Sequence, residues 1–127
     1  MLCLNEKLLS SRGIIKLYCS NNWEKDDTNL IVNCILEKIR EILLNSKKEI
    51  IMFCDCTKGE FPPLTIAFNI VSTMVNMKEV LENKLKYTLI YCDSESQKNW
   101  LNSILKIYTP VKPVYIVSTE EEIKTYL

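Results

Sequence analysis

Two acidic residues that each follow a run of apolar residues are the sharpest candidates for chemistry in this sequence. Asp55 comes after the apolar run 50–54, and Asp93 comes after a similar run over 86–92. If both runs are parallel strands, the two carboxylates lie at the edge where open parallel sheets bind ligands. Carboxylate oxygens are preferred ligands of Mg²⁺. One hypothesis is therefore a Mg²⁺-dependent phosphotransfer or phosphatase activity that uses these acids.

A simpler interpretation of the two acids needs no ligand. Asp is common at turns and at the residues that lead into helices. Asp55 would then open a turn and Asp93 would lead into a helix. We favour this interpretation and predict no metal site.

The composition excludes many other catalytic mechanisms. The chain has 127 residues, with 16 Lys plus Arg against 16 Asp plus Glu, and it has no His. Without His there is no Ser-His-Asp or Cys-His activation of a nucleophile and no His-ligated zinc. A net charge of zero provides no basic surface for a phosphate backbone, so we expect no nucleic-acid partner. We predict a non-catalytic protein with no catalytic residue and no cofactor.

The cysteines are expected to be reduced thiols. The first residues show neither a basic leader nor a long apolar stretch, so we expect a cytoplasmic protein without membrane insertion. A metal site of three thiolates, with Cys54 and Cys56 two residues apart and Cys92 nearby, would lack a fourth ligand. We therefore expect buried free thiols among the six cysteines, which are Cys3, Cys19, Cys34, Cys54, Cys56 and Cys92.

The hydrophobic pattern predicts a single α/β domain over residues 1–127. Continuous apolar runs bounded by charge are typical of buried parallel strands, and the 3.6-residue spacing of apolar residues indicates helices. We expect a mostly parallel sheet of about five strands with four covering helices. The expected strands lie at 2–4, 13–19, 49–54, 86–92 and 113–117, and the expected helices at 28–45, 64–83, 94–108 and 120–127.

Three of the expected helices have recognisable starts. Asp27 is a natural N-cap for the first helix. Ser94 with Gln97, and Thr119 with Glu122, each have the spacing of a capping box, in which the two side chains cap each other's backbone N–H groups.

This order of elements resembles the STAS fold of anti-sigma-factor antagonists and of sulfate-transporter tails. In that family a strand ends in Asp, as residues 52–55 do here, and a phosphorylatable Ser or Thr stands at the next helix start. Thr57 and Thr65 are the nearest hydroxyls, and neither occupies the family's position. The order is also similar to the lipid-binding CRAL-TRIO domain, with residues 101–117 resembling its closing helix and strand. The first resemblance implies a regulatory protein-binding role, and the second implies binding of a small lipid or acyl ligand.

The expected helix 64–83 is apolar on more than one side, which is typical of a helix that is buried or that covers a partner. We therefore expect a STAS-like module that binds another protein or a second copy of itself, with a small apolar ligand as the alternative. The surface that would bind lies at the loop after the strand 49–54, at the helix that follows it and at the end of the next strand. Its candidate residues are Asp55, Thr57, Lys58, Phe61, Leu64, Phe68 and Asp93.

Overall fold

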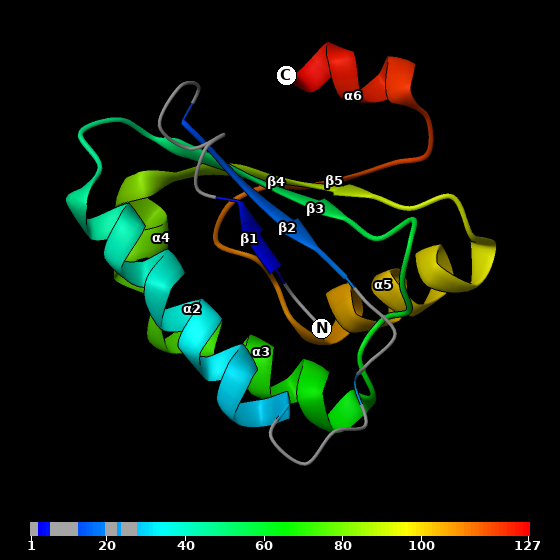
Figure 1. Ribbon diagram of the computed structural model, residues 1–127, viewed down its shortest axis with the longest axis horizontal. Coiled ribbons are helices and arrows are strands. Elements are labelled where there is room, and N and C mark those ends of the chain that lie inside the picture. The colour runs from blue at the N-terminus through cyan, green and yellow to red at the C-terminus, as the bar shows by residue number, and fades with distance from the viewer. Residues whose placement is uncertain (1–2, 6–12, 20–22, 24–27) are drawn as a thin grey trace.

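The structure is a computed structural model that describes residues 3–5, 13–19, 23 and 28–127 (Figure 1). Within these ranges the chain forms an α/β fold with one five-stranded sheet. None of the helices in these ranges is both long enough and apolar enough to cross a membrane. The strands are β1 (Cys3–Asn5), β2 (Ile14–Tyr18), β3 (Ile50–Asp55), β4 (Leu85–Tyr91) and β5 (Val114–Val117), and the helices are α2 (Thr28–Asn45), α3 (Leu64–Asn76), α4 (Lys78–Lys84), α5 (Glu95–Ile107) and α6 (Glu120–Tyr126).

The sheet follows the order of the chain. Strands β2 to β5 are parallel neighbours in sequence order, and β1 pairs with β2 in the antiparallel direction. Right-handed crossovers that always step the same way place every connecting helix on the same face of a sheet. Accordingly, α2 to α5 all lie on one face, and α6 lies on the other (Figure 1). The predicted α/β fold with a mostly parallel sheet is confirmed.

The described residues form five helices where the sequence pattern predicted four, because the expected helix 64–83 is divided. Helix α3 ends at Asn76, and α4 begins at Lys78. Met77 between them has φ −97° and ψ 12°, and its N–H donates to the carbonyl oxygens of Thr73 and Met74. Met77 is buried in the same core as Leu81 of α4. The break at Met77 therefore separates α3 from a second short helix, which buries Leu81 in the same core.

The two faces of the sheet carry different side chains because neighbouring residues of a strand point in opposite directions. We call the side covered by α2 to α5 the helix-covered face; it includes Ile15, Leu17 and Met52, which pack with α2 in the larger core. We call the opposite side the α6 face. Its smaller core consists of Ile14, Phe53, Leu89 and Val117, with Ile51, Tyr87, Tyr91, Ile123 and Tyr126 packed against it.

Aromatic rings close part of the α6 face. Tyr115 stacks on Tyr126 of α6 with ring centroids 4.8 Å apart, and Tyr87 meets Tyr115 edge-on at 5.5 Å. The Tyr87 hydroxyl donates a hydrogen bond to the carbonyl oxygen of Tyr126. On the same face, the Lys16 ammonium lies 5.1 Å from the ring centroid of Tyr18. Aromatic packing thus attaches a helix of seven residues to the sheet.

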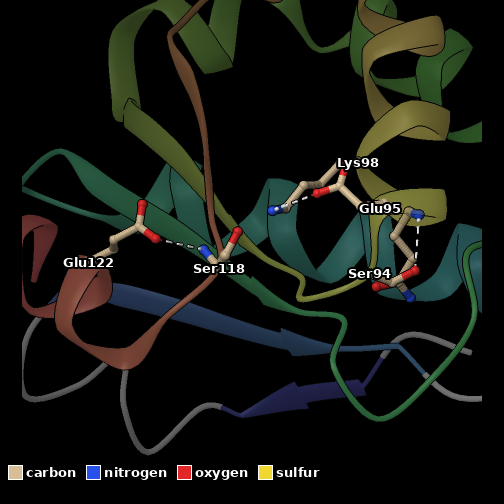
Figure 2. A network of polar contacts seen from close by, with 6 residues as sticks. Ser94, Glu95, Lys98, Ser118 and Glu122 are labelled. Atoms are coloured by element: carbon tan, nitrogen blue, oxygen red, sulfur yellow. Dashed lines mark hydrogen bonds and ion pairs between the residues drawn. The ribbon is translucent and has the colours of Figure 1, made fainter.

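The hydroxyl groups of the predicted helix caps accept the expected hydrogen bonds, but the return hydrogen bond of a capping box, from the third residue's side chain to the N–H of the cap residue, is replaced by other contacts. The Ser94 hydroxyl accepts from the N–H of Gln97, and the Thr119 hydroxyl accepts from the N–H of Glu122. Glu122 accepts from the N–H of Ser118 at 3.2 Å, one residue before the cap, as Figure 2 shows. The Gln97 side chain does not return to Ser94; it reaches the loop after β3, because two carbonyl oxygens lie within its range there. The predicted cap at Asp27 lies outside the described residues.

Candidate functional site

The loop between β3 and α3 carries three of the seven candidate residues, and it begins with a local turn at Asp55, the last residue of β3. The Asp55 carboxylate accepts from the N–H of Thr57 at 3.0 Å and from its hydroxyl at 2.6 Å. An Asp that bonds the backbone two residues later forms an Asx turn. This oxygen of Asp55 is therefore occupied by a structural contact, and Lys58 next to the turn is exposed.

Gln97, which sequence reasoning did not include in the site, fixes this loop from α5. Its side-chain amide nitrogen donates to the carbonyl oxygen of Cys56 at 3.1 Å and to that of Gly59 at 2.9 Å. Trp23 donates from its indole nitrogen to the carbonyl oxygen of Glu60 at 2.7 Å. Two side chains from distant parts of the sequence thus satisfy three backbone acceptors of the loop.

The remaining candidate residues lie in three different places. Phe61 packs on Trp100 of α5 with ring centroids 4.9 Å apart. Leu64 and Phe68 are on the outer side of α3, with 55% and 47% of their surface exposed. Asp93 is exposed two residues after the end of β4. Phe61 therefore faces the core while its two apolar neighbours face solvent.

Leu64 and Phe68 continue into an apolar row along α3. Val75, two turns beyond Phe68, is 54% exposed, and Val71 between them is partly exposed. The 13 residues of α3 include no charged side chain. The apolar character expected of this helix thus includes a row on its outer side, and no described side chain covers that row fully.

The two acids at the strand ends lie around Tyr91 on the α6 face. Asp55 is paired with Tyr91 in the register of β3 and β4. The pKa of the Tyr91 hydroxyl is raised by desolvation and then by the negative charges of Glu120, Asp55, Asp93 and Glu121. In the part of the chain that the structure describes, no group of three Cys, Asp or Glu side chains could hold a metal ion. Lys112 lies far from these acids, because it precedes β5 and pairs with Glu49 at the opposite ends of the strands.

The most distinctive feature of the helix-covered face is an apolar cavity of about 200 Å³. Its floor is formed by strand residues such as Met52, Ile90 and Thr88, and α2, α3 and α5 form its walls. Its partly exposed lining residues include Val71 and Met74 of α3 on one side and Leu105 and Tyr108 on the other. The cavity is therefore partly open to solvent between α3 and the end of α5.

Thiols line the end of the cavity next to the loop between β3 and α3. The sulfur atoms of Cys19 and Cys56 are 3.3 Å apart and share a hydrogen bond. This bond lowers the pKa of Cys19 and raises that of Cys56, since one thiol donates and the other accepts. Burial raises the pKa of Cys54 to about 12. Cys54 and Cys56 therefore remain neutral thiols in an apolar wall at neutral pH. The free cysteines of the described chain are Cys19, Cys34, Cys54, Cys56 and Cys92.

Sequence reasoning placed Phe61 in the site and missed most of the cavity. Met52, Ile90 and Met74 were recognisable as apolar residues of strands and a helix. Periodicity shows which residues turn inward, but it does not show whether the side chains that meet there fill the space. The only local signal was the surplus of apolar residues in the helix that became α3 and α4.

Comparison with known proteins identifies no relative of this chain. Neither protein-family models, nor curated proteins, nor solved structures include a significant match to this chain. The resemblance to STAS and CRAL-TRIO domains thus stays a prediction from the order of the elements.

Proposed function

We propose that this protein binds a small apolar ligand with an alkyl or acyl chain in the cavity of the helix-covered face. The observation that carries the proposal is a partly open cavity of about 200 Å³ with an almost wholly apolar wall. In another protein, an apolar cavity of about 150 Å³ stays dry and binds benzene. The volume here accommodates one alkyl chain of medium length.

Energetics also favour a ligand in this space. Unfilled space in a core costs about 24 cal/mol per Å³, which for this volume gives about 5 kcal/mol as an upper value, since the cavity is partly open. A domain of ordinary size has a total stability of only about 5–15 kcal/mol. A ligand that fills the cavity recovers part of this cost, which supports a binding role over a purely structural one.

The test is a calorimetric titration with 1-decanol, a neutral molecule with a single alkyl chain. We expect saturable binding to the wild type and its loss in Ala67→Phe, because Ala67 lines the cavity and the new ring occupies it. The matched control is Phe68→Ala, an adjacent change on the exposed side of α3. Absence of decanol binding to the wild type, or equal binding to Ala67→Phe, would contradict the proposal.

A second candidate function is self-association through the exposed row of α3. Leu64, Phe68 and Val75 present apolar surface to solvent on a helix without charged residues. The chain has a net charge of zero, so two copies do not repel each other strongly. The occupant we propose for this row is therefore a second copy of the chain, packed row against row.

Static light scattering tests the second candidate. We expect a dimer of the wild type that dissociates in Phe68→Ser, while Thr65→Ser, at an exposed position of the same helix beside the row, leaves it intact. A wild type that is monomeric at high concentration would contradict self-association. Decanol binding is measured separately, so the two candidates can be accepted or rejected independently.

A further inference from the structure

The cavity wall includes one charged residue, and that residue is at its rim. Lys112 is the single Lys, Arg, Asp or Glu among the lining residues of the described chain. Its side chain is 28% exposed, and the wall itself is almost wholly apolar. The alkyl stem of the lysine therefore lines the cavity while its ammonium group reaches the surface, as long cationic side chains commonly do.

The backbone holds Lys112 firmly in this position. Pro110 and Pro113 flank it within the segment between α5 and β5, and each proline fixes its own φ angle. The carbonyl oxygen of Pro113 accepts from the N–H of Thr88 at 3.0 Å, which ties the segment to the cavity floor. The backbone at Lys112 is thus constrained on both sides, which fixes the point from which the side chain extends.

The ammonium has donors available for a ligand. Among the described residues its ionic partner is Glu49, with the nitrogen and oxygen atoms 4.0 Å apart. That distance exceeds the range of a hydrogen bond, and an ammonium group has three donors. Glu49 is itself 54% exposed, so water screens the pair.

From this geometry we infer that the ligand is a medium-chain carboxylate, whose alkyl chain fills the cavity and whose carboxylate pairs with Lys112 at the rim. The inference rests on the proposed function and adds the chemical class of the head group. An apolar chain next to a single cationic rim residue matches an amphiphile with one negative end.

The experiment compares three ligands that share a decyl-length chain: decanoate, 1-decanol and decyltrimethylammonium. We expect the wild type to bind decanoate most tightly and the cationic amphiphile most weakly. Lys112→Met keeps the apolar stem and removes the charge, so it weakens decanoate binding about five- to tenfold and leaves decanol binding nearly unchanged. Lys112→Arg retains the preference for decanoate.

Two further variants make the test specific. Lys106→Met, at an exposed lysine of α5 outside the cavity wall, is the matched control and leaves all three affinities unchanged. Glu49→Gln removes the competing carboxylate and tightens decanoate binding about twofold. Because Glu49→Gln leaves the lysine in place, it tests the inference even if Lys112→Met folds poorly.

The outcomes separate the inference from the proposed function. Equal affinity of the wild type for decanoate and decanol, together with no effect of Glu49→Gln, overturns the inference and leaves the apolar binding site intact. Failure of all three ligands to bind overturns the proposed function as well. A selective loss of decanoate binding in Lys112→Met, with decanol retained, supports both.

Discussion

The two faces of the sheet are formed by the same strands, but the side chains on them pack into two different cores. On the α6 face, Ile14, Phe53, Leu89 and Val117 are all buried, and Ile123 and Tyr126 of α6 pack against this core. On the helix-covered face, four helices enclose a larger core that retains a cavity of about 200 Å³. The face covered by four helices is therefore the one on which the cavity lies. The difference indicates that the cavity is a feature of how α3 and α5 are placed and not a shortage of apolar residues.

The largest expected effect comes from truncating the core of the α6 face. Leu89 is fully buried at its centre, so Leu89→Ala should lower the free energy of unfolding by about 2–5 kcal/mol, from lost burial plus an unfilled space. The measurement is chemical denaturation. A cost below that of Leu105→Ala, at the partly exposed wall of the cavity, would contradict the contrast between the two faces.

Enlarging side chains should have opposite signs on the two faces. Val117→Phe on the α6 face should cost about 1–3 kcal/mol, because Val117 is fully buried in that core and a ring there would overpack it. Ala67→Leu on the cavity wall should instead raise stability by about 0.5–2 kcal/mol, as cavity-filling changes commonly do. Thermal unfolding of both variants without ligand measures the difference. A destabilised Ala67→Leu would indicate that the cavity is smaller than the structure shows.

As pH rises into the alkaline range, we expect the thiols of the helix-covered face to lower the stability first and the tyrosines of the α6 face to lower it afterwards. Burial raises the pKa of Cys54 to about 12 and also raises that of Cys92, so the folded state holds these protons more firmly than the unfolded chain. The contribution of these thiols to stability is therefore constant below about pH 8.5, the ordinary pKa of cysteine. The contribution of Cys54 falls as pH rises toward 12, by up to about 1.4 kcal/mol per pH unit, and that of Cys92 changes in the same direction.

Tyr87 and Tyr91 on the α6 face also have raised pKa values, because desolvation disfavours their charged forms. Their contribution is present below about pH 10, the ordinary pKa of tyrosine, and is lost above it. Denaturation midpoints measured across alkaline pH check this order. Cys54→Ala should flatten the first part of the decline and leave the second unchanged. An unchanged first part in this variant would show that the Cys54 thiol does not contribute.

The smallest effect is expected at the cap of α6. Thr119→Ala removes the hydroxyl that accepts from the N–H of Glu122 at 3.2 Å, and it should cost about 1 kcal/mol. Thr119→Ser retains the acceptor and is the matched control. Hydrogen exchange of the α6 amides should increase in the alanine variant while exchange in α2 remains unchanged. Equal increases in both helices would show that α6 does not unfold separately from the helix-covered face.

Much of the fold could be read from local patterns. The apolar runs that became β3 and β4 and the periodic residues of α2 fix their own secondary structure, because burial of one face requires that spacing. The division at Met77 was not predictable in the same way. A buried Met fits a continuous helix equally well, and the sequence carries no Gly or Pro at this point to indicate the break.

The candidate site was predictable only where it follows from position along a strand. The Asx turn at Asp55 and the cap at Ser94 are local contacts, and Asp and Ser are common at such turns and caps. Gln97 was expected to bond its own helix end and instead anchors the loop after β3, some forty residues away in the chain. No spacing rule predicts a contact of that separation.

The sequence by itself determined the alternation of strands and helices, the absence of histidine chemistry and the apolar row of α3, because each depends on residue type and short-range periodicity. Only the tertiary structure decided that all four crossover helices share one face, that α3 and α5 leave space between them, and that Lys112 stands at the rim of that space. These features depend on how side chains distant in sequence meet. Their volumes and directions are set by the packing of the whole chain and by no segment alone.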